Sequence, residues 1–518
     1  MGDEASPIRR IVIVGGGTAG WMSAAGLARV VPSSVTVTLI ESEEIGTVGV
    51  GEATIPTLSV FNEFLGIDED ELIRATGGSF KLGIEFVDWW RKGERYIHPF
   101  GTFGLDTVEF KFHHLWLRLR QALKGTETGA ELTGDITDYS LCALSAKLGR
   151  FGKANGGKPD PLMDSMRHAF HFDAARYAQM LRAYAEARGV HRIEGRIVDT
   201  HLRAEDGHIE EVTLTDGRSI AGDLFVDCSG FRSLLIGGAL KTPFVDWSAY
   251  LPCDRALAVP SPTLSPLPPF TRATADTAGW RWRIPLQHRT GNGYVYSSRY
   301  IDDDAARKRL LDSLDGTAMA EPRQIAFQTG HRERFWVGNC VAIGLAGGFI
   351  EPLESTSIHL IQMGIARLIQ FFPDSRFDRT DIAEYERQTR LDYEQVRDFI
   401  VLHYKATERD DTPFWRYCRD MAIPETLAQK IDLFRSKGRI VRYQEDLFTE
   451  ESWLAVLLGQ GILPRSYDQL VDRYTLDQLV MQMRRLRGGL MQTVQRLPTH
   501  GAFLDHLNRQ SAKADLRG

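Results

Sequence analysis

Several features are scarce in this chain of 518 residues, and each absence excludes a class of protein. The five cysteines are odd in number, widely spaced and form no C-x-x-C pair, so neither a disulfide framework nor a zinc site is indicated. No metal-ligand spacing such as H-E-x-x-H occurs, and no metal is expected. A reducing cytoplasm is the simplest location for such a chain.

Charge of one sign is also lacking. Lysine and arginine total 62 while aspartate and glutamate total 68, which gives a net charge of −6, so nucleic acid is not an expected partner. The long apolar run over 11–31 contains a three-glycine turn and is explained by a buried strand and helix. We therefore expect no transmembrane helix, no signal peptide and no membrane partner.

The chain does contain a nucleotide-binding pattern near its start. An apolar strand over 11–14 leads into glycines that fit G-x-G-x-x-G, and a helix follows over 21–31. A second strand, 35–40, ends on an acid where the ribose of an adenine dinucleotide is commonly bound. The pattern predicts a dinucleotide at the helix N-terminus and by itself does not distinguish FAD from NAD. The expected contacts are Gly15, Gly17, Thr18, Ala19, Gly20 and Glu41.

Two further glycine turns are expected to approach the same cofactor. The first is the loop 49–56, and the second follows an apolar strand over 335–345. The segment 346–357 is rich in backbone amides and leads into a helix, so it is a candidate site for a flavin edge or a small anion. Together these turns add the expected contacts Gly49, Gly51, Ala53, Gly344 and Leu345.

Alternating polar and apolar residues over 77–86 predict a strand with Lys81 on its polar face. From spacing alone, an exposed strand lysine is the favoured interpretation. Aromatic residues and histidines are dense over 89–116, where His98 and Phe100 lie. Such a cluster forms either core or the wall of a pocket for a flat aromatic ligand.

A β-hairpin is predicted over 279–300, with Asn292 and Gly293 in its turn. Trp280 and Trp282 then share one face of the first strand, so two indoles project side by side. Spacing alone is equally compatible with a pair of core tryptophans.

In their order along the chain, these motifs resemble those of the flavin-dependent tryptophan halogenases. The resemblance spans about residues 8 to 370, and W-x-W-x-I-P distinguishes these halogenases from other FAD enzymes of the same fold. The shared motifs are G-x-G-x-x-G followed by Trp21, the 49–56 loop, Gly77-Gly78-Ser79-Phe80-Lys81, Asp227-Cys228-Ser229-Gly230-Phe231, Trp280-x-Trp282-x-Ile284-Pro285 and Pro352-Leu353-Glu354-Ser355-Thr356.

The resemblance implies an α/β fold, α+β overall. An FAD-binding, doubly wound sheet of the flavin hydroxylase type, with an added β meander, is joined to a largely helical substrate lobe. Residues 1–375 are expected to form the FAD-binding module, with substrate-lobe segments interleaved at about 57–170. Residues 376–518 are expected to complete the substrate lobe with helices.

The resemblance also implies a chemistry. FADH2 from a separate reductase reacts with oxygen to give a C4a-hydroperoxide, which chloride or bromide attacks to form hypohalous acid. Lys81 then directs that acid onto an indole-like substrate, and Glu354 takes the ring proton. The halide site falls at Thr356 and Ser357. Residues beside the substrate, or separating it from the flavin, are Trp280, Trp282, His98 and Phe100.

The C-terminal part departs from the tryptophan-selective members. Those carry a tyrosine pair, an acid and an asparagine that hold the amino-acid head group, whereas 442–461 has no tyrosine pair and has Leu457 where the asparagine is sought. Burying an ammonium and a carboxylate without partners is costly. The expected substrate is therefore an indole without the head group, or an indole carried on something larger, with Trp453 as a stacking wall.

Two alternatives remain at this stage. A flavin-dependent aromatic monooxygenase would hydroxylate its substrate without needing halide. A non-catalytic dinucleotide-binding redox sensor would leave Lys81 and Glu354 without a shared pocket. A separate flavin reductase is the implied partner, and a homodimer stays open beside a monomer.

Overall fold

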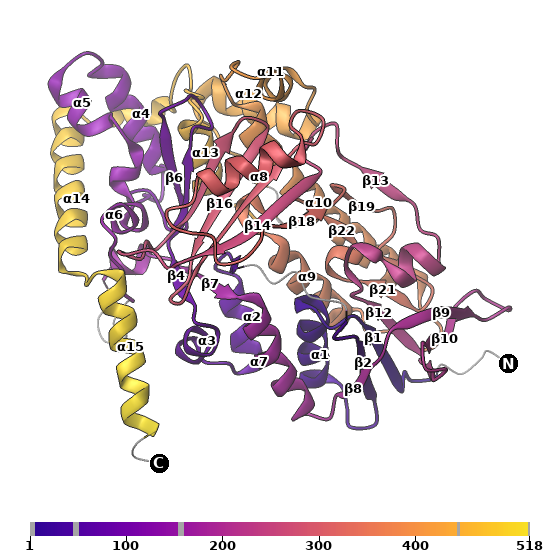
Figure 1. The fold of residues 1–518 in the computed structure, drawn as a ribbon. Coiled ribbons are helices and arrows are strands. Elements are labelled where there is room, and N and C mark those ends of the chain that lie inside the picture. The colour runs from indigo at the N-terminus through magenta and orange to yellow at the C-terminus, as the bar shows by residue number, and fades with distance from the viewer. Residues whose placement is uncertain (1–5, 45–50, 154–159, 443–445, 516–518) are drawn as a thin grey trace. The chain divides into compact units, whose positions relative to one another are not determined.

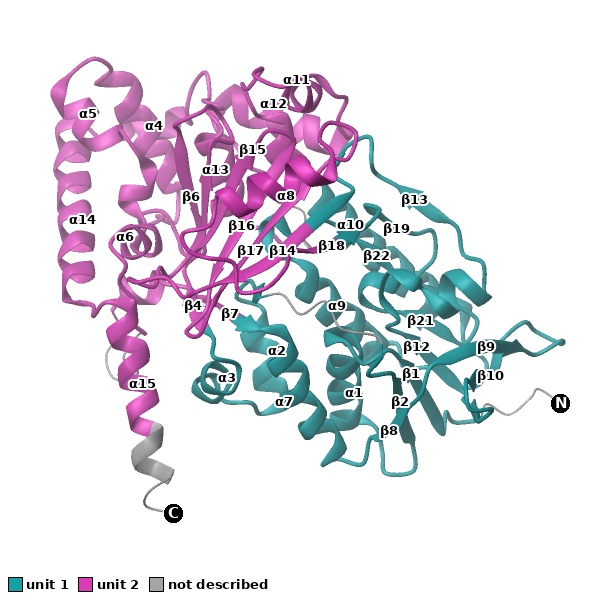
Figure 2. Cartoon of the chain, viewed as in Figure 1, with its two compact units in different colours: residues 1–78, 172–256, 325–397 teal, residues 79–171, 257–324, 398–518 magenta. Residues whose placement is uncertain are grey.

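The computed structural model describes residues 6–44, 51–153, 160–442 and 446–515. The chain forms two compact units, each built from three separate segments (Figure 2). Unit 1 comprises residues 1–78, 172–256 and 325–397, and unit 2 comprises residues 79–171, 257–324 and 398–518. The predicted cofactor contact Gly49 lies outside the described residues.

Unit 1 is organised around a six-stranded sheet with the order β20-β21-β12-β1-β2-β8 (Figure 1). Strand β1 pairs in parallel with β2 on one side and with β12 on the other. Most of β1 is buried, as expected for a parallel strand covered on both faces. The strands are β1 (Arg10–Val14), β2 (Thr36–Glu41), β8 (His191–Glu194), β12 (Leu224–Asp227), β20 (Trp336–Val337) and β21 (Cys340–Ala342). The mixed α/β fold is confirmed.

Helices α1, α7 and α9 of unit 1 are close neighbours, with α1 contacting the other two. Helix α7 begins after Asp173 because that carboxylate accepts the N–H groups of Ala175 and Arg176. The helices are α1 (Thr18–Val30), α2 (Leu58–Leu65), α3 (Glu69–Thr76), α7 (Ala174–Glu186), α9 (Ser357–Gln370) and α10 (Arg379–Lys405), whose residues up to Arg397 belong to this unit.

The predicted β meander is confirmed as an antiparallel sheet of β9 (Ile197–Leu202), β10 (Ile209–Leu214) and β11 (Ser219–Ala221). Apolar side chains of β10 and of β1 belong to one buried cluster, so the meander packs on the parallel sheet. Unit 1 also contains β3 (Gly51–Ala53) and a small sheet of β13 (Phe244–Asp246), β19 (Gly330–Arg332) and β22 (Gly348–Phe349).

Unit 2 contains a seven-stranded sheet with the order β18-β14-β17-β16-β15-β5-β6. A separate short strand, β4 (Ser79–Lys81), pairs antiparallel with β7 (Ala169–Asp173). The strands of the large sheet are β5 (Gly83–Val87), β6 (Arg95–Pro99), β14 (Arg255–Ser261), β15 (Thr271–Asp276), β16 (Gly279–Pro285), β17 (Thr290–Tyr296) and β18 (Arg323–Ala326).

Helices make up most of the C-terminal segment of unit 2, residues 398–518. Their apolar faces bury aromatic residues such as Phe414 and Trp415. The helices of this unit are α4 (Phe112–Ala122), α5 (Glu127–Thr133), α6 (Leu141–Lys147), α8 (Asp303–Asp312), α11 (Pro413–Asp420), α12 (Glu425–Lys437), α13 (Glu450–Gly459), α14 (Leu476–Arg496) and α15 (His500–Asp515).

The structure corrects three local predictions. The single strand predicted over 77–86 is wrong, because β4 and β5 belong to different sheets and Leu82 between them donates its N–H to Pro269. The hairpin of β16 and β17 is confirmed, but its chain reversal lies at 286–289, where the Leu286 N–H bonds the Arg289 carbonyl. The apolar run 335–345 is not one strand either, since it contains the antiparallel pair β20 and β21.

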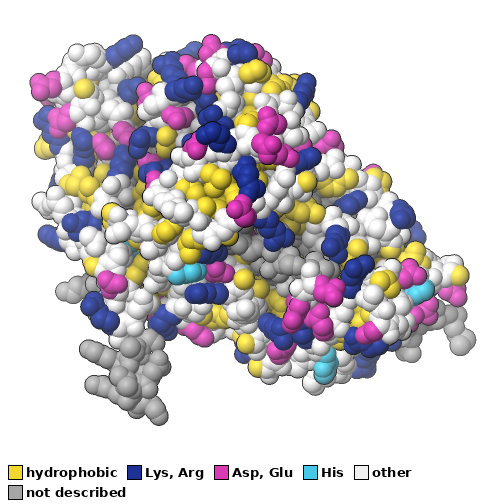
Figure 3. All heavy atoms as spheres, viewed as in Figure 1, with side chains coloured by type: hydrophobic (Ala, Val, Ile, Leu, Met, Phe, Trp, Pro, Cys, Tyr) yellow, Lys and Arg dark blue, Asp and Glu magenta, His cyan; other side chains and the backbone are white. Residues whose placement is uncertain are grey.

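On the face of the molecule shown in Figure 3, basic and acidic side chains do not gather into separate patches. Basic and acidic side chains are interspersed there (Figure 3), in keeping with the near balance of the two signs. None of the described helices is long and apolar enough to cross a membrane. The five cysteines are all buried and free.

Candidate active site

The glycine turn after β1 is built as the sequence pattern requires. Gly15 has a φ of +112°, and a Cβ there would lie 2.3 Å from the Cys228 carbonyl oxygen at the end of β12. A Cβ on Gly20 would lie 1.8 Å from the Gly15 carbonyl oxygen, so α1 packs directly against the turn. A Cβ on Gly17, in contrast, would have no described heavy atom within 4 Å. The first and third glycines are needed for close packing, whereas the second leaves room for a ligand.

The N-terminus of α1 offers donors to an anion. Gly17 is the N-cap in an extended conformation, and none of the described side chains caps the helix. The first-turn N–H groups of Thr18 and Ala19 therefore have no intrahelical partner, and the helix dipole adds partial positive charge. This turn fits the pyrophosphate of a dinucleotide.

Glu41, at the end of β2, lies against the same turn. Its Oε1 accepts a bond from Arg192 Nε at 2.5 Å, and its Oε2 accepts one from Trp21 Nε1 at 3.3 Å. A Cβ on Gly16 would lie 1.5 Å from Glu41 Oε2, so glycine is required there too. Arg192, which the sequence pattern did not single out, holds the carboxylate that is expected to bind ribose.

The other predicted cofactor contacts of unit 1 lie in two further turns. Gly344 has a φ of +73°, and a Cβ there would lie 2.8 Å from Ala19 Cβ, so this turn meets the start of α1. Leu345 follows in the same helical turn. Gly51 and Ala53 are buried in β3. Between them, burial raises the pKa of Glu52 to about 7.

The predicted halide site lies at the start of α9. Thr356 is the N-cap of this helix, and Ser357 is its first residue. Thr356 is fully buried, and its hydroxyl has no hydrogen-bond partner within the described part of the chain. A buried hydroxyl without a partner is costly and, beside helix N–H groups, suits a small anion. Glu354, two residues earlier, is also fully buried.

In unit 2, Lys81 lies at the end of β4 and is fully buried, so the exposed lysine favoured by spacing is wrong. Its Nζ lies 5.0 Å from the centroid of the Phe100 ring. The His98 ring lies edge-on to Phe100 at a centroid distance of 6.4 Å. The fold thus brings together three predicted site residues, and an aromatic face accepts the ammonium through a cation–π contact.

A phenylalanine that sequence reasoning missed connects this group to Trp453. Phe399 of α10 lies 5.7 Å from the His98 ring and 5.0 Å from the Trp453 ring, both in edge contacts. Lys430 Nζ lies 4.3 Å from the Trp453 ring centroid. Trp453 is buried, and its indole N–H has no acceptor among the described residues. We refer to Lys81, His98, Phe100, Phe399 and Trp453 as the lysine–aromatic cluster.

Trp280 and Trp282 project from the same face of β16, with ring centroids 6.2 Å apart and planes at 58°. Trp280 also lies 6.4 Å from Trp89. The Trp282 ring covers Gly293 of β17, where a Cβ would lie 2.0 Å from the indole. This contact explains why a glycine occupies position 293 within a strand, since it is needed for clearance under a tryptophan.

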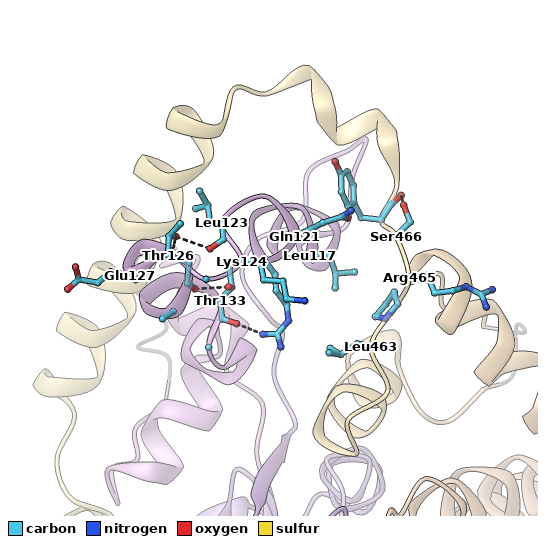
Figure 4. A pocket seen from close by; sticks show the side chains of 17 residues that line it. Leu117, Gln121, Leu123, Lys124, Thr126, Glu127, Thr133, Leu463, Arg465 and Ser466 are labelled. Atoms are coloured by element: carbon cyan, nitrogen blue, oxygen red, sulfur yellow. Dashed lines mark hydrogen bonds between the residues drawn. The ribbon is translucent and has the colours of Figure 1, made fainter.

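An open groove of about 670 Å³ lies elsewhere in unit 2, beside α4 and α5 (Figure 4). It is lined by residues such as Leu117, Lys124 and Leu463, and by none of the predicted site residues. We therefore do not assign the reaction to this groove. Among the described residues, no group of three or more histidine, cysteine, aspartate or glutamate side chains could hold a metal ion.

Most of the chain is similar in sequence to known proteins. A family model described as tryptophan halogenase matches residues 10–475. The chain is 35% identical over 494 residues to tryptophan 7-halogenase RebH from Lentzea aerocolonigenes. The match covers 88% of this chain and 90% of that protein. It is likewise 35% identical over 477 residues to tryptophan 6-halogenase SttH from Streptomyces toxytricini, with coverage of 88% and 90%.

Solved structures show the same similarity. A flavin-dependent halogenase from Xanthomonas campestris superposes with a TM-score of 0.92 at 47% identity, covering 97% of this chain and 98% of that one. The flavin-dependent halogenase BrvH from Brevundimonas sp. BAL3 superposes with a TM-score of 0.91 at 47% identity, covering 96% and 99%.

Proposed function

This chain belongs to the tryptophan halogenase family, and we propose that it halogenates an indole-like aromatic ring through Lys81. As a member of that family it is a flavin-dependent halogenase that uses FADH2 and a halide. The observation that carries the proposal is the fully buried Lys81, whose Nζ lies over the Phe100 ring in the lysine–aromatic cluster. A buried cation beside aromatic walls suits the activation of an oxidant next to a flat arene.

The residues of unit 1 fit FAD. The open space at Gly17 and the uncapped start of α1 suit the pyrophosphate, while Glu41 has lone pairs left for ribose hydroxyls. Bound as FADH2, the cofactor would supply the electrons that activate O2, so that FADH2, O2, halide and one proton yield FAD, hypohalous acid and water. We place the halide at the N-terminus of α9, where the buried Thr356 hydroxyl and the Ser357 N–H can donate to it.

Lys81 has the task of making hypohalous acid reactive enough to attack an arene. The ammonium donates a hydrogen bond to the oxidant or forms an N-halo species with loss of water, and it fixes which ring carbon the halogen meets. When the oxidant is hydrogen-bonded hypohalous acid, the ring carbon bonds to the halogen as the bond between halogen and oxygen breaks, and hydroxide leaves. When it is the N-halo species, the bond between halogen and nitrogen breaks and the neutral Lys81 amine leaves.

Glu354 completes the substitution. A carboxylate in a dry site stabilises the positive charge that develops on the attacked ring, and it takes the ring proton. That proton ends in water with the departing hydroxide or, on the N-halo path, restores the Lys81 ammonium. We assign Trp280 and Trp282 the role of a barrier that keeps the substrate from direct oxidation by the flavin, without reacting themselves.

The substrate we propose is an indole without an amino-acid head group, or an indole carried on a larger molecule. RebH and SttH are named tryptophan halogenases, but the segment 442–461 lacks the tyrosine pair expected to hold free tryptophan. The unpartnered indole N–H of Trp453 gives the lysine–aromatic cluster a buried donor for an acceptor on the substrate. His98 and Phe100 would flank the ring.

Product mass tests the function directly. The protein is incubated with FAD, a flavin reductase with its nicotinamide, indole and bromide, and the product is analysed by mass spectrometry with and without halide. The bromine isotope doublet of bromoindole supports halogenation. A gain of one oxygen that does not need bromide indicates a monooxygenase, and bound FAD without conversion of indole or of a panel of larger indoles indicates a non-catalytic redox protein.

The source of FADH2, the location of the protein and the roles of its two units complete the proposed function. We propose a separate flavin reductase as the source of FADH2 and a cytoplasmic location, where reduced flavin is produced and buried thiols stay free. We also assign unit 1 to cofactor binding and unit 2 to substrate binding.

A further inference from the structure

The strand that carries Lys81 is tied to its neighbours by a chain of buried hydrogen bonds. Ser79 Oγ donates to the Pro285 carbonyl at 2.6 Å and lies 3.0 Å from His171 Nδ1. His171 Nε2 lies 2.9 Å from Thr271 Oγ1. Three strands and the end of the W-x-W-x-I-P motif therefore meet in one row of polar groups, and Ser79 and His171 are fully buried.

The direction of this chain is determined by its carbonyl end. The Pro285 carbonyl can only accept, so the Ser79 hydroxyl gives its proton there and must accept the next bond. His171 Nδ1 then carries a hydrogen and donates to Ser79, which leaves Nε2 to accept from the Thr271 hydroxyl. Each group is satisfied when His171 is the neutral Nδ1–H tautomer, in which Nε2 accepts from the Thr271 hydroxyl.

His171 and Lys81 share one face of the paired strands β4 and β7, which lie side by side (Figure 1). Ser79 is directly opposite His171, and Lys81 follows Ser79 by two residues, so the three side chains project to the same side. Burial is the main cause that lowers the pKa of His171 well below its usual value, and the positive charge of Lys81 lowers it further. The imidazole is thus neutral beside the ammonium.

The backbone of the same strand is held by a second histidine. The Phe80 N–H donates to His500 Nε2 at 3.2 Å, and His500 Nδ1 lies 3.1 Å from the Leu267 carbonyl oxygen. Since that carbonyl accepts, His500 is also a neutral Nδ1–H tautomer. Strand β4 has three residues, and histidines anchor the first two. The backbone position of the last residue, Lys81, is fixed as a result.

We propose that His171 is a positioning residue for Lys81: held between Ser79 and Thr271 as a neutral imidazole, it fixes strand β4 and keeps a second positive charge away from the lysine ammonium. The inference rests on the proposed role of Lys81 in halogen transfer. Misplacing a reacting group by about 1 Å can cost roughly 100-fold in rate. Loss of His171 should therefore impair transfer to the arene and leave the formation of hypohalous acid, a task of unit 1 residues, unchanged.

Five variants of the full chain test this, one of which is Lys81→Ala as the reference for loss of the lysine. His171→Leu removes both ring nitrogens at similar volume, His171→Asn keeps an N–H donor where Nδ1 donates to Ser79, and Ser79→Ala removes the link to Pro285. His168→Leu is the matched control, because the His168 ring packs edge-on against Phe80 and Phe170, on the opposite face from Lys81. Each reaction contains FADH2, bromide and indole with a 1,3-diketone trap, and bromoindole and trapped hypobromous acid are both measured beside the melting temperature.

We expect His171→Leu and Ser79→Ala to lower the bromoindole yield roughly 10- to 100-fold while trapped hypobromous acid rises to balance it. His171→Asn should recover most of the yield, and His168→Leu should match the unsubstituted protein. The inference is overturned if His171→Leu forms bromoindole normally while Lys81→Ala does not. It is also overturned if both products fall together, because that indicates a general loss of structure; if His171→Leu fails to fold, Ser79→Ala decides. A failure of the proposed function is recognised separately, since Lys81→Ala would then brominate indole normally.

Discussion

Glu354 is a fully buried acid two residues before the proposed halide site, so its role can be tested at the scale of one residue. We expect Glu354→Gln to lower the halogenation rate roughly 100-fold, because an amide of nearly the same shape cannot take the ring proton. The measurement is turnover with indole and bromide, with the FAD affinity checked beside it. Glu333→Gln is the matched control, since that residue is exposed. A near-normal rate for Glu354→Gln would show that the acid is structural.

Glu52 gives a prediction of pH dependence. Its pKa is raised to about 7 in the folded protein by burial, from about 4.5 in the unfolded chain. Between these values the folded state binds more protons, so this contribution to the free energy of unfolding is complete below pH 4.5 and is lost as the pH rises through 7. We expect the melting temperature of FAD-free Glu52→Gln, relative to the unsubstituted protein, to rise from pH 5.5 to pH 8.5. A constant difference would contradict the raised pKa.

The sequence motifs point to candidate site residues, but the burial of those residues and the side chains that they contact could not be predicted from the sequence. The Gly-Gly-Ser-Phe-Lys context points to Lys81, yet alternation predicted exposure, because the partner strand β7 comes from about 90 residues further along the chain. Phe399 carries no local signal, as it is one apolar residue in a long helix, although it connects His98 to Trp453. Arg192 was missed for the same reason, since its partner Glu41 is remote in sequence.

At the scale of elements, two glycines in the turn between β1 and α1 have different roles: Gly20 is needed for packing, and Gly17 for ligand binding. Gly20→Ala would place a Cβ 1.8 Å from the Gly15 carbonyl oxygen, so we expect it to lower the melting temperature of the FAD-free protein. Gly17→Ala meets no described atom within 4 Å and should keep that melting temperature while lowering FAD affinity at least about tenfold, because the pyrophosphate must approach this backbone. Calorimetry and FAD titration measure both. Unchanged FAD affinity in Gly17→Ala would contradict the dinucleotide site.

Elements with a strong periodic pattern were predictable, and those decided by distant pairing were not. The strand, turn and helix at 11–31 and the helix α7 follow from local sequence, because glycines and an Asp173 cap define their ends. The break between β4 and β5 does not, since both strands continue one alternating pattern and differ only in the sheets that they join. The turn of the hairpin was predicted at Gly293, but this glycine is needed to make room for the Trp282 ring and does not mark the reversal of the chain.

At the scale of the whole molecule, the stability of the protein should report which dinucleotide it binds. A ligand that binds the folded state at 100 times its Kd adds about 2.7 kcal/mol to the free energy of unfolding. We expect FAD to raise the melting temperature by a few degrees, measured by differential scanning calorimetry, and NAD at the same concentration to leave it unchanged. Stabilisation by NAD instead of FAD would contradict the flavin assignment, a choice that the glycine pattern alone left open.

The most direct test of the account is to follow the halogen with and without the buried lysine. The unsubstituted protein, Lys81→Ala and the exposed-lysine control Lys124→Ala are given FADH2, bromide and indole, and bromoindole is quantified by mass spectrometry while FAD binding is monitored. We predict that Lys81→Ala binds FAD normally and forms bromoindole at least about 100-fold more slowly, with Lys124→Ala unaffected. Bromoindole formed by Lys81→Ala at the unsubstituted rate would contradict the account.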